Sequence, residues 1–405
     1  MNIIIRNQYL EILKKFKDTE FIKVITGVRR SGKTFVIKMF HDFLLNQGID
    51  KKQIIYISFE SLQMHELLNK KKLYTYIDSH RIANKKMYLF FDEIQRVEGF
   101  EDVINSFLID FPSDIYVTGS NASLLSGELA TYLAGRYIEI PVFPLSFKEY
   151  LNFKQSKKNV ELQFYDYVSE GGFPAVVLSK DDKQVKRLIT QGIFDSIVLR
   201  DISMRAQVKN DALLLRLTEY LLDIVGNPIS ANKILGSFQN EGMKLKNSQS
   251  IIKYMSLLES AFIFYKVQRY DLRGKERLST LGKYYAVDTG LRNVVLQKDF
   301  HDNLGYQIEN IVYIELLRRG YAINVGKYND FEIDFVARYG KEIVYYQVTQ
   351  QLPINSNREI ENLRYLPDNY KKIVLTANRM DVGKTAGIEI IHVIDWLLDN
   401  DFDYN

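Results

Sequence analysis

The run Gly27-Val28-Arg29-Arg30-Ser31-Gly32-Lys33-Thr34 decides how the first part of the chain folds. Its spacing, G-x-x-x-x-G-K-T, is that of a phosphate-binding loop, in which glycines let backbone N–H groups curl around an anion. An apolar stretch of β type over residues 21–25 precedes the loop, and a helical pattern over 34–40 follows it. The amino end of that helix would face the phosphate. The alternative interpretation is a tight strand-to-helix turn that binds nothing.

The loop therefore predicts a nucleotide site in which particular residues have particular tasks. Lys33 would reach the β- and γ-phosphates, which makes it a candidate catalytic residue, and the Thr34 hydroxyl would ligate Mg²⁺. The predicted nucleotide-binding residues are Gly27, Arg30, Ser31, Gly32, Lys33, Thr34 and Phe35.

A second apolar run, residues 87–91, ends in the carboxylates of Asp92 and Glu93. Many strands end in a solvated acid, so the pair alone is a weak signal. It gains weight because strand and helix patterns separate it from the phosphate-binding loop, as in nucleotide-hydrolysing folds. We predict that Asp92 holds Mg²⁺ and that Glu93 polarises the attacking water.

A third strand pattern, residues 114–118, runs into Gly119-Ser120-Asn121. Polar residues at the carboxyl ends of strands lie where ligands bind in open α/β sheets. Ser120 or Asn121 could therefore bind the γ-phosphate or the lytic water, or Asn121 could simply cap the next helix. Arg136, before the strand pattern at 138–142, is a candidate arginine finger in cis or from a neighbouring subunit. The alternative for Arg136 is a surface salt bridge.

The composition limits the class of protein. A chain of 405 residues with 46% hydrophobic and 26% charged residues is globular and long enough for two or three domains. It contains no cysteine, which excludes disulfides, thiolate metal sites and a cysteine nucleophile and suits the cytoplasm. No apolar run approaches the ~18 residues of a membrane span, so we expect no membrane partner. The net charge of +4 is too small to indicate nucleic-acid binding by itself.

Four motifs together resemble one group of AAA-superfamily proteins, bacterial and archaeal ATPases with a C-terminal domain of unknown function. They are I-T-G-V-R-R-S-G-K-T, L-F-F-D-E-I-Q, T-G-S-N-A-S-L-L-S-G-E-L-A-T-Y-L-A-G-R-Y and P-L-S-F-K-E-Y-L. The resemblance covers nearly the whole chain. It implies an α/β P-loop fold with an additional strand, and it places the strand that ends at Asp92 between the P-loop strand and its neighbour. It also implies ATP and Mg²⁺ as ligands, Asn121 as a sensor and Arg136 as a finger.

Three regions are expected: a P-loop core over 1–155, a helical and winged-helix region over 156–295, and an α/β domain over 296–405. Residues 205–292 follow the order helix, helix, helix, ribbon, and they hold 14 Lys and Arg against 8 Asp and Glu. The basic residues near the ribbon tip are Arg269, Arg273, Lys275 and Arg277. They could meet DNA phosphates. Alternatively, the region is a spacer or a protein dock with a solvated basic face.

The last region resembles nucleases of the PD-(D/E)xK type. Glu309 and Asp334 occupy positions that match two of that family's acidic residues, but Gln347-Val348-Thr349 stands where an acid-x-Lys is expected. Gln is a weak ligand for a hard cation, and Thr349 cannot supply the charge of a lysine. We therefore predict a degenerate, inactive nuclease-like domain that serves binding or assembly.

The sequence as a whole favours an ATP-binding, Mg²⁺-dependent ATPase that acts as an AAA-type molecular switch. Its winged-helix and nuclease-like regions would bind DNA or a protein partner, and a finger acting in trans would require a homo-oligomer. Two alternatives remain open at this point: an ATP-gated nuclease, and a slow-turnover module that binds DNA or recruits proteins according to its nucleotide.

Overall fold

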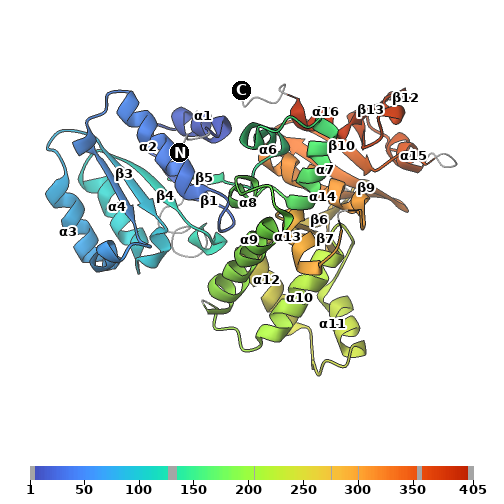
Figure 1. Cartoon of the computed structure of the whole chain (residues 1–405), viewed down its shortest axis with the longest axis horizontal. Coiled ribbons are helices and arrows are strands. Elements are labelled where there is room, and N and C mark those ends of the chain that lie inside the picture. Colours follow the sequence, from blue (N-terminus) through green and yellow to red (C-terminus); the bar gives the residue numbers. More distant parts are fainter. Residues whose placement is uncertain are drawn as a thin grey trace. The chain divides into compact units, whose positions relative to one another are not determined.

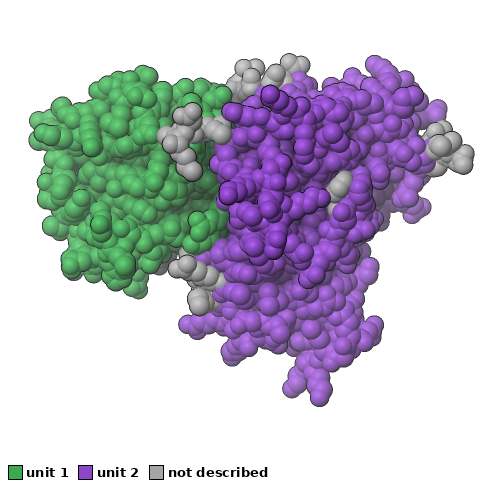
Figure 2. Space-filling view, viewed as in Figure 1, with its two compact units in different colours: residues 1–143, 260–262 green, residues 144–259, 263–405 purple. Residues whose placement is uncertain are grey.

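The computed structural model describes residues 5–125, 135–204, 206–274, 276–299, 301–353 and 358–399. The chain divides into two units, which Figure 2 colours separately. Unit 1 comprises residues 1–143 and 260–262, and unit 2 comprises residues 144–259 and 263–405.

Unit 1 is built on a sheet of five parallel strands in the order β2-β3-β4-β1-β5. This confirms the predicted α/β P-loop fold. The strands are β1 (Ile22–Thr26), β2 (Ile54–Ser58), β3 (Met87–Asp92), β4 (Ser113–Thr118) and β5 (Tyr137–Pro141). Pro141 is tolerated because it ends an edge strand, where no further strand needs its missing N–H.

One detail of the predicted topology is wrong. The strand that ends at Asp92, β3, is not next to the P-loop strand β1, because β4 lies between them and pairs with both. The strand inserted beside β1 is therefore the one that ends at Thr118. This order matters for the site, since it puts the carboxyl end of β4 between the P-loop and Asp92.

Successive side chains of each strand point to opposite faces of the sheet. Both faces are buried under helices, so unit 1 has three layers (Figure 1). In β3, Leu89 and Phe91 pack with α3 and α4, whereas Tyr88 and Phe90 pack with α1 and α2. The helices are α1 (Asn7–Lys15), α2 (Lys33–Asn46), α3 (Lys70–His80) and α4 (Phe100–Asp110).

Unit 2 begins with helices whose first turns are closed by polar side chains. Ser146 and Glu149 form a capping box on α6, and Asn159, Asp182 and Asn210 accept backbone N–H groups at the starts of α7, α9 and α10. The helices of unit 2 up to residue 296 are α6 (Phe147–Lys154), α7 (Val160–Glu170), α8 (Pro174–Val177), α9 (Lys183–Asp195), the π-helical η5 (Ser196–Met204), α10 (Asp211–Asp223), α11 (Ala231–Asn240), α12 (Gln249–Ser260) and α13 (Thr289–Leu296).

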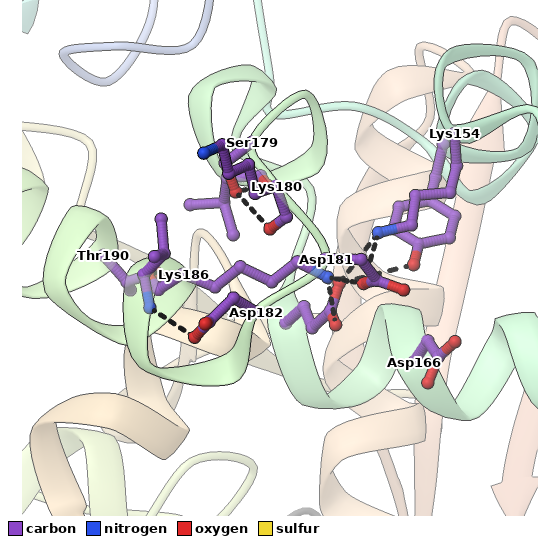
Figure 3. Close-up of polar contacts among 12 residues, drawn as sticks. Lys154, Asp166, Ser179, Lys180, Asp181, Asp182, Lys186 and Thr190 are labelled. Carbon is purple, nitrogen blue, oxygen red and sulfur yellow. Dashed lines mark hydrogen bonds and ion pairs between the residues drawn. The ribbon is translucent and has the colours of Figure 1, made fainter.

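Ion pairs of the buried Lys186 connect three of these helices (Figure 3). The Lys186 ammonium on α9 lies 2.5 Å from a Glu170 carboxylate oxygen on α7 and 2.6 Å from Asp181. Lys154 of α6 adds a second cation, 3.0 Å from the same Asp181 oxygen. Burying Lys186 without these carboxylates would leave an unpaired charge, so the network fixes how the helices pack.

The rest of unit 2 forms a sheet of eight strands in the order β12-β13-β11-β10-β9-β8-β6-β7. The hairpin β6–β7 belongs to it, because Arg269, Tyr270 and Asp271 of β6 pair with β8. The sheet therefore crosses residue 295, where a domain boundary was expected. Its elements are β6 (Phe264–Asp271), β7 (Glu276–Ala286), α14 (Leu304–Arg318), β8 (Ala322–Tyr328), β9 (Phe331–Tyr339), β10 (Glu342–Thr349), α15 (Arg358–Arg364), β11 (Lys371–Thr376), β12 (Gly383–Thr385), β13 (Ile388–His392) and α16 (Val393–Leu398).

Candidate nucleotide-binding site

The loop after β1 has the backbone conformation that its glycines predict. Gly27 and Gly32 have φ values of 133° and 102°, and Arg30 adopts φ 68°, which is unusual for a residue with a Cβ. A Cβ on Gly27 would lie 2.2 Å from the Val142 carbonyl oxygen, so only glycine fits this position. The Lys33 ammonium is buried and donates to the carbonyls of Gly27 (2.9 Å) and Val28 (3.0 Å).

The loop leads into the amino end of α2, a helix of 14 residues. The Ser31 side chain is fully buried, and its hydroxyl has no hydrogen-bond partner among the residues that the structure describes. A buried hydroxyl without a partner, beside a helix amino end and a lysine, suits an anion. Arg30 is exposed and Phe35 is half-buried on the first turn of α2.

The Asp92 carboxylate accepts hydrogen bonds from hydroxyl groups of three elements. The Thr34 hydroxyl lies 3.2 and 3.0 Å from its two carboxylate oxygens, Thr118 of β4 donates at 2.6 Å, and Tyr56 of β2 donates at 3.2 Å. Burial raises the pKa of Asp92 above its ordinary value, and the hydrogen bonds from Thr118 and Thr34 offset part of that rise. The two predicted metal ligands, Thr34 and Asp92, are thus brought together in a site that disfavours an isolated negative charge. A hydroxyl and a carboxylate are oxygen donors of the kind that Mg²⁺ takes.

Glu93 follows directly and has a left-handed backbone, with φ 58°. Its N–H donates to the Thr118 hydroxyl at 2.9 Å, so one threonine orients both acidic residues. The Glu93 carboxylate accepts from the Ser120 hydroxyl at 2.6 Å and from the Gln95 side-chain amide. The predicted general base is therefore held by two neutral donors.

The two remaining predicted catalytic residues lie in different places. Asn121 follows Ser120 at the carboxyl edge of the sheet, and its carbonyl accepts the N–H of Leu124 as η4 (Ala122–Leu125) begins. Arg136 is exposed. It lies at the opposite edge of the sheet, because its carbonyl accepts the N–H of Ile22, the first residue of β1. Its guanidinium lies 3.4 Å from Asn105. A strand of five residues separates that edge from the loop, roughly 13 Å, so the topology does not favour a role for Arg136 in its own chain.

Thr118, Tyr56 and Gln95 were missed as site residues. Thr118 ends a strand and precedes Gly119-Ser120, so its position was visible, but its contact with Asp92 depends on β4 lying beside β3. Gln95 lies two residues after Glu93, in a segment whose turn the sequence does not predict.

A second polar cluster, in unit 2, concerns the expected nuclease-like residues. The Glu309 and Asp334 carboxylates do approach one another, but the ammonium of Lys283 on β7 lies between them, 3.1 Å from Glu309 and 3.7 Å from Asp334. Glu332 is a third partner at 3.0 Å. Burial alone would lower the pKa of Lys283, but the carboxylates of Glu309, Asp334 and Glu332 outweigh it and raise that pKa above its usual value.

The strand pairing explains the role of Gln347 in this cluster. Its side-chain oxygen accepts the N–H of Asp334 at 3.3 Å, and Val348 donates its N–H to the Asp334 carboxylate at 2.9 Å. In the described part of the chain, no three His, Cys, Asp or Glu side chains are arranged to hold a metal ion. A lysine thus occupies the centre of the nuclease-like cluster, so these residues do not fit a divalent cation.

The basic residues near the hairpin tip differ in their surroundings. Arg269 is 3.6 Å from Glu332, whereas Arg273 is exposed. Lys275 lies outside the described residues, as does the side chain of Arg277. Among the described side chains of the 205–292 region, the other exposed cations are Lys209, Lys233, Lys244, Lys246, Lys253 and Lys266. No helix in the described residues is long and apolar enough to cross a membrane.

Comparison with known proteins agrees with the P-loop fold of unit 1. Residues 19–151 match the model of an AAA domain, and residues 161–302 match a domain of unknown function (DUF8612). A Walker-type ATPase of Pyrococcus abyssi superposes with a TM-score of 0.50 over 72% of this chain and 95% of its own. At 13% identity, that likeness shows the fold alone.

Two sequence relatives are similar over most of their length. An uncharacterized protein of Haemophilus influenzae is 45% identical over 400 residues, 98% of this chain and 99% of the relative. The uncharacterized protein MJ1544 of Methanocaldococcus jannaschii is 32% identical over 382 residues, 87% of this chain and 82% of the relative. With this identity, coverage and domain match, the chain belongs to the family of AAA-domain proteins that these two relatives represent.

Proposed function

We propose that this protein is a Mg²⁺-dependent ATPase of the AAA type, a molecular switch whose unit 1 binds and hydrolyses ATP. The observation that carries the proposal is the hydrogen-bonded group formed by Thr34, Asp92 and Thr118 beside the phosphate-binding loop. Thr34 and Asp92 would hold Mg²⁺. When bound, the cation would offset the negative charge of the β- and γ-phosphates.

The residues of unit 1 would divide the work of hydrolysis. Lys33 exchanges its two carbonyl partners for phosphate oxygens and stabilises the charge that develops on the γ-phosphoryl group. Glu93 orients the attacking water and accepts its proton as the new P–O bond forms. The bond to the bridging oxygen breaks, which leaves ADP and inorganic phosphate. Asn121 would sense the γ-phosphate, and Arg136 would act on the nucleotide of a neighbouring subunit.

A second candidate function is a slow-turnover, nucleotide-dependent binding module. The contacts of Glu93 favour it, since Ser120 and Gln95 already occupy both oxygens of that carboxylate. A carboxylate whose two oxygens already accept hydrogen bonds is less available to an attacking water.

Unit 2 would bind DNA or a protein partner according to which nucleotide is bound to unit 1. α10, α11 and α12 followed by the hairpin β6–β7 have the element order of a winged helix-turn-helix. The exposed lysines Lys244, Lys246 and Lys253 lie on α12 or on the segment before it, where they suit DNA phosphates. Lys283 in the Glu309–Asp334 cluster argues against the ATP-gated nuclease, because the position of a metal cation is taken by an ammonium.

The decisive comparison is phosphate release from ATP and Mg²⁺ by the wild type, Glu93→Gln and the control Glu98→Gln, an exposed neighbouring glutamate. We expect turnover by the wild type and the control, and at least a 100-fold loss in Glu93→Gln with ATP binding retained. A wild type that binds ATP tightly without turnover would support the binding module instead. A wild type that does not bind ATP would overturn both candidates.

A further inference from the structure

The buried guanidinium of Arg6 connects the phosphate-binding loop to the end of unit 1. Arg6 precedes α1 and is only 2% exposed. One of its terminal nitrogens donates to the carbonyl of Ser31 at 3.0 Å, and the other donates to the carbonyl of Phe143 at 3.1 Å. Ser31 belongs to the loop, and Phe143 is the last residue of this part of unit 1 before the chain enters unit 2.

Tyr9 contacts both Phe143 and Arg6. Its hydroxyl accepts the N–H of Phe143 at 3.2 Å, and its ring lies under the Arg6 guanidinium, 4.5 Å from centroid to Cζ. Both polar backbone atoms of Phe143 are therefore held by side chains from the first ten residues of the chain. A charge-assisted pair of hydrogen bonds from one planar guanidinium fixes distance and direction at once.

The loop also touches this segment directly. The N–H of Val142 donates to the carbonyl of Thr26 at 2.8 Å, and the Val142 carbonyl fills the space that a Cβ on Gly27 would need. The start of the loop is thus in contact with Val142, and Ser31 further along is joined to Phe143 through Arg6. A shift of the loop cannot leave Val142 and Phe143 unchanged, because closely packed contacts transmit displacement.

We propose that Arg6 is a positioning residue that relays nucleotide occupancy of the loop to the Val142–Phe143 segment, and so to the chain entering unit 2. The inference rests on the proposed function, since it assumes that ATP binds at the loop. When Lys33 leaves the carbonyls of Gly27 and Val28 for phosphate, the loop loses two internal hydrogen bonds. Arg6, which is hydrogen-bonded to the Ser31 carbonyl, passes the change to Phe143.

Hydrogen exchange measured with and without ATP and Mg²⁺ tests the relay, with ATP affinity measured on the same samples. Arg6→Lys keeps the charge but cannot span both carbonyls in the geometry of a guanidinium. Tyr9→Phe removes only the hydroxyl that holds Phe143. Arg81→Met, an exposed arginine that pairs with Asp78, is the matched control.

We expect ATP to slow exchange at residues 142–146 in the wild type and in Arg81→Met. Arg6→Lys should weaken ATP binding by about tenfold, as loss of one charge-assisted contact predicts, and should abolish the ATP-dependent change at 142–146. Tyr9→Phe should retain ATP affinity within twofold and lose at least half of that change. Tyr9→Phe leaves the loop intact, so it tests whether the contacts of Phe143 carry the ATP-dependent change in exchange even if Arg6 variants fold poorly.

Two results would overturn the relay. One is an unchanged ATP-dependent exchange pattern in folded Arg6→Lys, and the other is an unchanged pattern in Tyr9→Phe. Either result leaves the proposed ATPase intact if the wild type still hydrolyses ATP. A wild type that fails to bind ATP would instead remove the proposed function on which the relay rests.

Discussion

The Thr34 hydroxyl lies within 3.2 Å of both carboxylate oxygens of Asp92, although 58 residues separate them in the chain. This contact joins the end of the phosphate-binding loop to the carboxyl end of β3. It places two oxygen donors together at the edge of the sheet where nucleotides bind in open α/β folds.

Asp92→Asn should stabilise the protein without nucleotide while it abolishes Mg²⁺-dependent turnover. Burial raises the pKa of Asp92 in the folded state, so ionisation above pH 3.8 disfavours folding. The stability advantage of Asp92→Asn should therefore grow as the pH rises above that value. Thermal unfolding at neutral pH should show a higher Tm for Asp92→Asn than for the wild type. A smaller Tm difference between Asp92→Asn and the wild type at pH 7 than at pH 4 would contradict this.

Ser120→Ala should increase basal ATP turnover, because it removes a 2.6 Å hydrogen bond and frees one oxygen of the Glu93 carboxylate for the attacking water. We expect kcat to rise about three- to tenfold, with the ATP dissociation constant unchanged. Steady-state phosphate release and equilibrium titration separate these two quantities. Ser106→Ala, a serine on α4 whose hydroxyl donates to the Asp102 carbonyl, is the control. A fall in kcat in Ser120→Ala would show that Ser120 aligns Glu93 instead of restraining it.

Lys283→Met should destabilise unit 2 strongly, because it leaves Glu309 and Asp334 buried without their cation. Breaking such a pair costs about 3–5 kcal/mol. The contribution of Lys283 to the free energy of unfolding is fully present below the ordinary lysine pKa of 10.5, because the pKa of Lys283 is raised in the folded state. Urea unfolding at pH 7 measures the loss, and at lower pH the carboxylates can protonate and the loss should shrink. Lys266→Met, an exposed lysine of β6, should change stability by less than about 0.5 kcal/mol.

Asp288 should make the stability of unit 2 fall between pH 3.8 and about 6. Burial raises the pKa of Asp288 to about 6, although backbone N–H groups of Gly172 and Leu291 donate to it. The folded state binds the proton more tightly than the unfolded state in that window, so stability is lost as the pH rises through it. Against Asp288→Asn, the wild type should lose about 3 kcal/mol between pH 3.8 and 6.5, from roughly two pKa units. A constant difference between the two proteins would contradict the assignment.

Lys244, Lys246 and Lys253 should set the salt dependence of any DNA binding. If they contact phosphates, changing all three to Gln should reduce the slope of log K against log salt by about one for each contact. Fluorescence anisotropy with a duplex at several salt concentrations measures the slope. An unchanged slope would favour a protein partner for this region.

The sequence carried enough information for unit 1 because its signals are local. The loop spacing, the apolar run before Asp92 and Glu93, and the Gly119-Ser120 strand end each identify an element without reference to the rest of the chain. What was missed depends on which elements become neighbours. Thr118 joins Asp92 to Glu93 only because β4 lies beside β3, and the resemblance suggested a different strand order.

The unit 2 cluster was missed for the same physical reason. The resemblance to PD-(D/E)xK nucleases implied Glu309 and Asp334 as an acidic pair, but Lys283 comes from β7, whose place in the same sheet is not encoded locally. A basic residue in an expected hairpin is normally solvated, so its charge alone gives no sign of burial. Arg6 likewise carries no motif, and only its contacts with Ser31 and Phe143 distinguish it.

Binding of ATP with Mg²⁺ to the wild type and to Lys33→Ala, measured by isothermal titration, tests the central claim most directly. Lys33→Ala removes the cation predicted to contact the β- and γ-phosphates while leaving the glycines of the loop in place. We expect saturable binding by the wild type and a loss of at least tenfold in affinity for Lys33→Ala, with both proteins equally folded. Equal ATP affinity for the two proteins would contradict it.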